Sequence, residues 1–147
     1  MNFETMREVL QRVEIFHRNL SAYFERRGAN EKQEKIKLLL DYLSRHESNL
    51  AQAVQAFSAH GQQGVLNTWL QYTSPALPVD CAISDQMAFD EVIKVALVFD
   101  DSLLDLYRTV VQEADIPEVR EVAENLLAME NEERRRRTRS IAELQDM

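Results

Sequence analysis

Apolar side chains recur every three or four residues along four long stretches of the chain. This spacing places them on one face of an α-helix. The sequence therefore predicts four amphipathic helices, over residues 3–27, 31–60, 84–114 and from 117 towards the end of the chain.

The breaks between these stretches carry residues that are typical of helix ends. Gly28 is expected to end the first helix in the left-handed conformation, and Ser84 or Asp85 to cap the third. Residues 115–118 supply the next break, in which Asp115 or Ile116 precedes Pro117 in the first turn of the fourth helix. The first and last connections are short, so each should join two antiparallel neighbours.

The connection over residues 61–83 is too long for a simple turn and too apolar for a solvated linker. We expect it to cross the length of the bundle, with a short helical turn around residues 65–70. Trp69 and Tyr72 should pack over the side of the bundle as anchors of this crossover, and a role in stacking on a ligand is the alternative. Residues 1–147 are thus predicted to form a single all-α domain, a four-helix bundle with one long crossover between its second and third helices.

Each predicted helix has one polar residue where its apolar stripe should continue, namely His17, Glu47, Asp100 and Glu130. Glu47, for example, lies four residues after one leucine of its stripe and three before the next. A lone carboxylate among apolar side chains is costly unless it is paired, protonated or bound to a metal. Four such residues at similar depth predict one polar layer inside the bundle.

Other polar residues have simpler explanations. His46 lies about 100° around the helix from Glu47 and should sit at the boundary of the core. His60 is expected at a helix end. The basic run at residues 134–137 follows acidic residues at a spacing of four, which predicts a solvated, self-paired helix end. The alternative for this run is an anionic partner or an acidic helix of a second subunit.

Composition narrows the classes of function. The net charge of −8 argues against general binding to nucleic acid. Cys81 is the single cysteine, which excludes an internal disulfide and a cysteine-rich metal site. The chain begins with charged residues rather than a signal peptide, and its longest apolar run, residues 95–99, is too short to cross a bilayer. A cytoplasmic protein that binds neither membranes nor nucleic acid is therefore expected.

The helix order and the polar layer resemble the ferritin-like, rubrerythrin-type family of di-iron carboxylate proteins. In that family two helices each give one Glu and the other two each give Glu-x-x-His. Here the corresponding segments read Glu47-Ser-Asn-Leu50 and Glu130-Asn-Glu-Glu133, so both histidines are replaced. The motifs of the family are therefore eroded in this chain.

The two remaining helices also depart from the pattern. Rubrerythrin-type helices often carry a tyrosine seven residues after the lone carboxylate, and Asp100 and Tyr107 keep this spacing. In the first helix His17 and Phe24 stand in place of that pair. The resemblance thus extends over nearly the whole chain in architecture but only partly in the ligands.

Two hypotheses follow from the resemblance. The first is a non-catalytic ferritin-like bundle with a decayed dinuclear metal site and no cofactor, which forms a homodimer and acts as a structural or interaction module. Its polar layer would be a buried cluster that shares protons. The alternative is a metal-binding oxidoreductase or metal-storage protein. Its iron or manganese would be held by an atypical set consisting of His17, Glu47, Asp100, Glu130 and Glu133.

Overall fold

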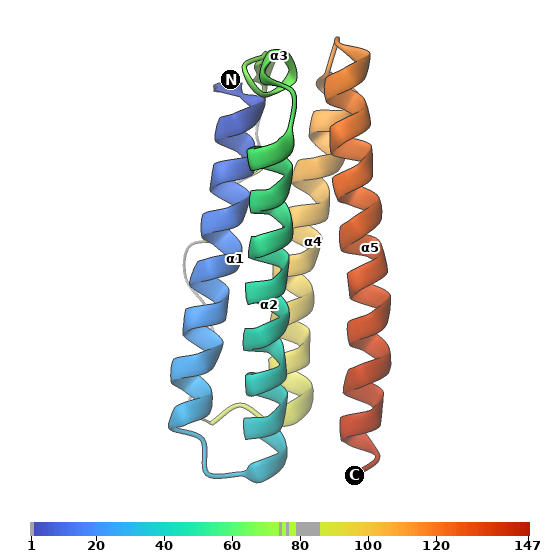
Figure 1. The fold of residues 1–147 in the computed structure, drawn as a ribbon. Coiled ribbons are helices and arrows are strands. Elements are labelled where there is room, and N and C mark those ends of the chain that lie inside the picture. The colour runs from blue at the N-terminus through green and yellow to red at the C-terminus, as the bar shows by residue number, and fades with distance from the viewer. Residues whose placement is uncertain (1, 74, 76, 79–85) are drawn as a thin grey trace.

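Four long helices run side by side along the molecule (Figure 1). The computed structural model describes residues 2–73, 75, 77–78 and 86–147. Its elements, in chain order, are β1 (Asn2–Thr5), α1 (Met6–Ala29), α2 (Glu34–His60), α3 (Gln63–Leu66), β2 (Trp69–Tyr72), α4 (Phe89–Glu113) and α5 (Pro117–Gln145). The chain is mostly helical, as predicted, and a small sheet is added to the helices.

The direction of the helices explains the long connection. Figure 1 shows α1 descending, α2 returning upwards, α4 rising in the same direction as α2, and α5 descending to the C-terminus. α2 therefore ends at one end of the bundle, and α4 begins at the other. None of the helices described is long and apolar enough to span a membrane.

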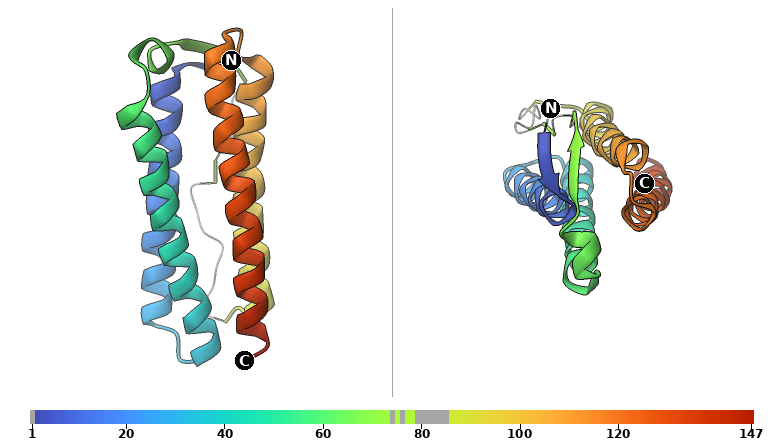
Figure 2. Two further views of the ribbon diagram at one scale, coloured as in Figure 1. Left: turned by 45° about the vertical axis from the view of Figure 1, so that its right-hand side comes forward. Right: turned by 90° about the horizontal axis from the view of Figure 1, so that it is seen from above.

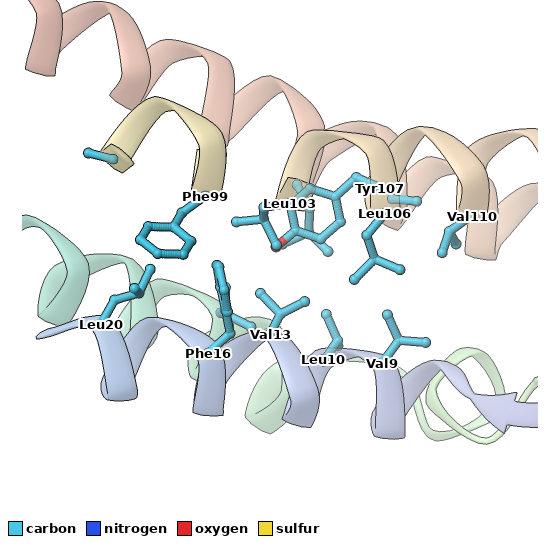
Figure 3. Packing of buried hydrophobic residues seen from close by; sticks show 14 of the residues in the cluster. Val9, Leu10, Val13, Phe16, Leu20, Phe99, Leu103, Leu106, Tyr107 and Val110 are labelled. Carbon is cyan, nitrogen blue, oxygen red and sulfur yellow. The ribbon is translucent and has the colours of Figure 1, made fainter. Parts of the chain in front are cut away.

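The apolar faces of the helices meet in the interior (Figure 3). On α1 and α4 the facing side chains include Phe16 and Phe99, whose ring centroids lie 6.2 Å apart at an interplanar angle of 72°. This edge-to-face geometry is favourable for aromatic pairs. Leu10 and Leu106 continue the same layer towards the end of the bundle that carries the sheet.

The first helix begins later than its apolar pattern predicts. Phe3 belongs to β1, and α1 starts at Met6. The hydroxyl oxygen of Thr5 accepts a hydrogen bond from the backbone N–H of Glu8 at 3.2 Å, and the Glu8 carboxylate accepts one from the backbone N–H of Thr5. This capping box satisfies N–H groups that have no partner within the helix, and it fixes the start of α1.

β1 and β2 form a two-stranded antiparallel ribbon over one end of the bundle (Figure 2). Phe3 pairs with Gln71. Successive side chains of a strand point to opposite faces, so Leu70 and Tyr72 are buried whereas Trp69 is exposed. The expected short helical turn exists but lies slightly earlier, as α3 over Gln63–Leu66, and Trp69 and Leu70 belong to β2 instead. The expected packing of Trp69 over the bundle is wrong, while Tyr72 is buried as an anchor should be.

Gly28 does not have the left-handed conformation expected of it. α1 continues to Ala29, and none of the described residues has a positive φ. A Cβ atom on Gly28 would lie 2.9 Å from Oδ1 of Asp41 and 3.4 Å from Cβ of Leu40. The glycine thus serves the close approach of α1 and α2.

The second helix also starts later than predicted, at Glu34. The Glu31 carboxylate is 2.9 Å from the Arg27 guanidinium and accepts hydrogen bonds from the backbone N–H groups of Lys32 and Gln33. These contacts stabilise a turn before the helix, because one carboxylate oxygen accepts from two successive backbone N–H groups.

In the second pair of helices the turn between them agrees with the prediction, but α4 starts four to five residues later than its predicted cap, after the N-cap Ala88. α4 ends at Glu113, and Pro117 occupies the first turn of α5 as expected. α4 begins at Phe89. The predicted caps Ser84 and Asp85, and also Cys81, lie outside the described residues.

Candidate functional site

His17 lies at the centre of the predicted polar layer, midway along α1. Its Nδ1 is 2.5 Å from Oε2 of Glu47 on α2, and its Nε2 is 3.0 Å from Oε1 of Glu130 on α5. All three side chains are buried. Helical spacing therefore brought together three of the predicted residues, one from each of three helices.

The charge states of His17, Glu47 and Glu130, which we call the trio, depend on the contacts among these three side chains. Burial alone would lower the pKa of His17, but Glu47 and Glu130 outweigh it and raise the pKa to about 10. At neutral pH His17 is thus an imidazolium, and each of its two N–H groups donates to one carboxylate. It forms a cationic link between α2 and α5.

The two carboxylates differ in their response to burial. For Glu47, burial would raise the pKa, but the His17 cation outweighs this and lowers it. For Glu130 the burial effect prevails over His17, and its pKa is raised. Glu47 is therefore the firm anionic partner of His17, and Glu130 is the carboxylate that takes up a proton more readily.

Tyr107 on α4 lies next to Glu130, and its ring is part of the core (Figure 3). Burial raises its pKa well above the ordinary value, and the Glu130 carboxylate close by raises it further. Among the described side chains, its hydroxyl has no hydrogen-bond partner at good geometry. Tyr107 is therefore a neutral phenol that closes the α4 side of the layer.

Asp100 was predicted to lie in the same layer, but it pairs with Arg137 instead of with the trio. Nη1 of Arg137 donates to Oδ1 of Asp100 at 2.9 Å, and Nη2 of Arg137 contacts Oδ2 of the same carboxylate. Arg137 is only 2% exposed. Burial lowers its pKa, which Glu47 and Tyr42 partly offset. A second buried ion pair thus joins α4 to α5 next to the first.

From the sequence alone Arg137 is assigned to the solvated basic run, whereas the structure buries it. The apolar stripe of α5 contains the signal that would have revealed it. Arg137 lies seven residues after Glu130 and four before the buried Ile141, so it falls on the stripe rather than on the outer face.

The other arginines of the run are paired, though mostly with partners other than those predicted. Arg134 pairs with Asp101 of α4 at 2.8 Å. Arg136 contacts Glu132, as predicted, at 3.7 Å and also Glu133 at 3.1 Å. The run therefore contributes to the contact between α4 and α5 as well as to the surface of α5.

Glu133 and His46 lie beside the layer rather than in it. The Glu133 side chain is 29% exposed, and Oε2 is 3.9 Å from Nδ1 of His46. His46, which was expected at the boundary, is buried and stacks on Tyr42 with ring centroids 6.0 Å apart. Burial lowers the pKa of His46 to about 4, so it is neutral at pH 7. His60 is exposed at the end of α2, as expected.

This arrangement does not fit a dinuclear metal site. Both ring nitrogens of His17 are directed at carboxylates, and Asp100 is engaged by Arg137. In the part of the chain that the structure describes, no group of three or more His, Cys, Asp or Glu side chains has a geometry that could hold a metal ion. The trio instead has the donors and acceptors of a proton-sharing cluster.

Comparisons of the chain with protein-family models, curated proteins and solved structures gave no match. The resemblance to the rubrerythrin-type family therefore stays a prediction from the sequence, and so do the single domain, the homodimer and the cytoplasmic location.

Proposed function

We propose that this chain is a non-catalytic bundle of ferritin-like connectivity that serves as a structural or interaction module. In this proposal the imidazolium of His17 holds the polar layer together in place of a metal. The supporting observation is the contact of both His17 ring nitrogens with Glu47 and Glu130.

The chemistry of the layer favours a structural role over catalysis. A general base needs a free lone pair within reach of a substrate, whereas both nitrogens of His17 are occupied and the trio is buried. Glu47 and Asp100 are each neutralised by a cation. These contacts join α1, α2, α4 and α5 near mid-length, and a paired polar layer of this kind can fix the register of packed helices.

The alternative proposal is a protein that binds iron or manganese. The observation in its favour is the convergence of His17, Glu47 and Glu130 from three helices. To accept a divalent ion, this set would have to release the proton of His17 and turn at least one of its ring nitrogens away from a carboxylate. Metal binding would then compete with the ion pairs that hold the layer together.

Metal analysis of protein purified from cells supplemented with iron and manganese tests the proposal. We expect no stoichiometric metal and no rise in the unfolding temperature when Fe²⁺ or Mn²⁺ is added. His17→Glu is the matched comparison, because it replaces the cation by a third carboxylate and should give metal-dependent stabilisation. About one tightly bound equivalent of either metal in the wild-type protein would overturn the proposal in favour of the alternative.

A further inference from the structure

The outer face of the β1–β2 ribbon exposes two large aromatic side chains. Phe3 and Trp69 are each 64% exposed, whereas Leu70 and Tyr72 on the opposite face are buried. The ribbon lies over the end of the bundle (Figure 2). Aromatic side chains of this size are typical anchors of protein interfaces.

A cavity of about 390 Å³ adjoins these aromatic residues. Its walls come from the ribbon on one side and from the turn between α4 and α5 on the other, where Ile116 is 42% exposed. We call it the ribbon pocket; its lining residues are Phe3, Thr68, Trp69, Leu70, Gln71, Glu113, Asp115, Ile116 and Val119. This volume lies near the lower end for a small-molecule site, so it suits one or two side chains of a partner.

The rim of the ribbon pocket is acidic. Glu113 and Asp115 line it, both are exposed, and neither forms an ion pair with any other residue that the structure describes. Arg120, on the first turns of α5, is directed at the carbonyl oxygen of Ala114 at 2.7 Å. The two rim carboxylates are thus available to a cation from outside.

The negative charge of the rim favours a cationic partner. An anionic membrane surface or a nucleic acid would be repelled, both by the rim and by the net charge of −8. A symmetric contact between two copies through this face would bring four rim carboxylates into one interface, which is unfavourable. A segment with lysine or arginine beside an apolar side chain complements both the rim and the pocket.

We propose that the ribbon pocket docks a protein segment that presents a large apolar side chain flanked by lysine or arginine. This inference rests on the proposed interaction role and names the chemistry of the partner. The apolar side chain would enter between Trp69 and Ile116, and the flanking cations would meet Glu113 and Asp115.

Selection of random peptides displayed on phage, with the wild-type chain as target, tests the inference. We expect the selected peptides to carry aromatic or large aliphatic residues next to Lys or Arg. Trp69→Ala should weaken binding of the selected peptide, made synthetically, about tenfold or more. The matched control is Val98→Ala, which truncates another exposed apolar side chain, on α4, and should leave binding unchanged.

The charge is tested separately with the double variant Glu113→Lys/Asp115→Lys, which should lose the basic peptides and select acidic ones. Failure to enrich any peptide, enrichment without a basic bias, or equal losses in the Trp69 and Val98 variants would overturn the inference. Metal analysis reports on the polar layer independently. A metal-free protein without peptide binding would refute only the docking surface, and a metal-loaded protein with peptide binding would refute only the metal-free layer.

Discussion

Raising the pH from 7 to 9 should destabilise the folded protein, because only the folded state holds the proton of His17. Its pKa is about 10 in the folded chain against an ordinary value of 6.5. Since the folded-state pKa is the higher of the two, the stabilisation is fully present below pH 6.5 and is lost as the pH rises towards 10. Each pH unit within this window removes about 1.4 kcal/mol from the free energy of unfolding. Two units give a loss of about 3 kcal/mol, as an order of magnitude.

Between pH 6.5 and 10, His17 accounts for most of the expected change in the free energy of unfolding among the groups of the layer. The pKa of Glu47 is lowered, so its contribution is present above its ordinary pKa of 4.5 and is lost only in acid. His46, with a pKa lowered to about 4, loses its contribution as the pH falls below 6.5. Glu130, whose pKa is raised, acts in the same direction as His17. Stability should therefore be greatest near pH 6.5 and fall on both sides.

Urea unfolding at pH 7 and pH 9 measures the effect. The double variant His17→Gln/Glu47→Gln is the control, because it keeps polar side chains at both positions but removes the ion pair, and it should lose most of the dependence on pH. A free energy of unfolding that is constant or rises between pH 7 and 9 in the wild-type protein would refute the imidazolium. A rise that requires added metal would indicate that His17 is a ligand, because metal binding improves as its ligands lose protons.

Two further predictions concern the surrounding helices. Asp100→Ala leaves the guanidinium of Arg137 buried without its partner and should lower the free energy of unfolding by about 3 kcal/mol or more. Arg137→Met should cost less, since the Asp100 side chain is nearer to solvent. Asp101→Ala, at an exposed ion pair, should change stability by less than about 1 kcal/mol, and equal effects at Asp100 and Asp101 would contradict the buried pair. Gly28→Ala should stabilise α1 by up to about 1 kcal/mol, because the side chain of Asp41 can move aside, whereas clear destabilisation in thermal unfolding would show that the contact with α2 outweighs the gain in helix propensity.

The four helices and most of the layer could be predicted because both depend on local spacing. His17, Glu47 and Glu130 each interrupt an apolar stripe, and helical geometry then turns all three inwards. The short connections and Pro117 were readable for the same reason. These signals lie within a few residues of the element that they define.

The remaining features depend on contacts between distant parts of the chain. Phe3 and Trp69 lie in strands that pair across more than sixty residues, and neither strand is long enough to show a period of its own. The partner of Asp100 is Arg137, which lies on a different helix. Because Arg137 stands in a run of arginines, its position on the apolar stripe of α5 was not recognised. Gly28 has a sequence context that is typical of a helix end, but the approach of α2 decides its role.

The protonation state of His17 tests the metal-free layer most directly. Isotope labelling of the histidine side chains and an NMR titration of the ring nitrogens would follow His17 apart from His46 and His60. We predict that both ring nitrogens of His17 carry protons at pH 7 and that its pKa lies near 10, while His46 stays neutral. A His17 ring that is neutral at pH 7, or whose nitrogen signals shift on addition of Fe²⁺ or Mn²⁺, would contradict the claim that its imidazolium holds the polar layer together.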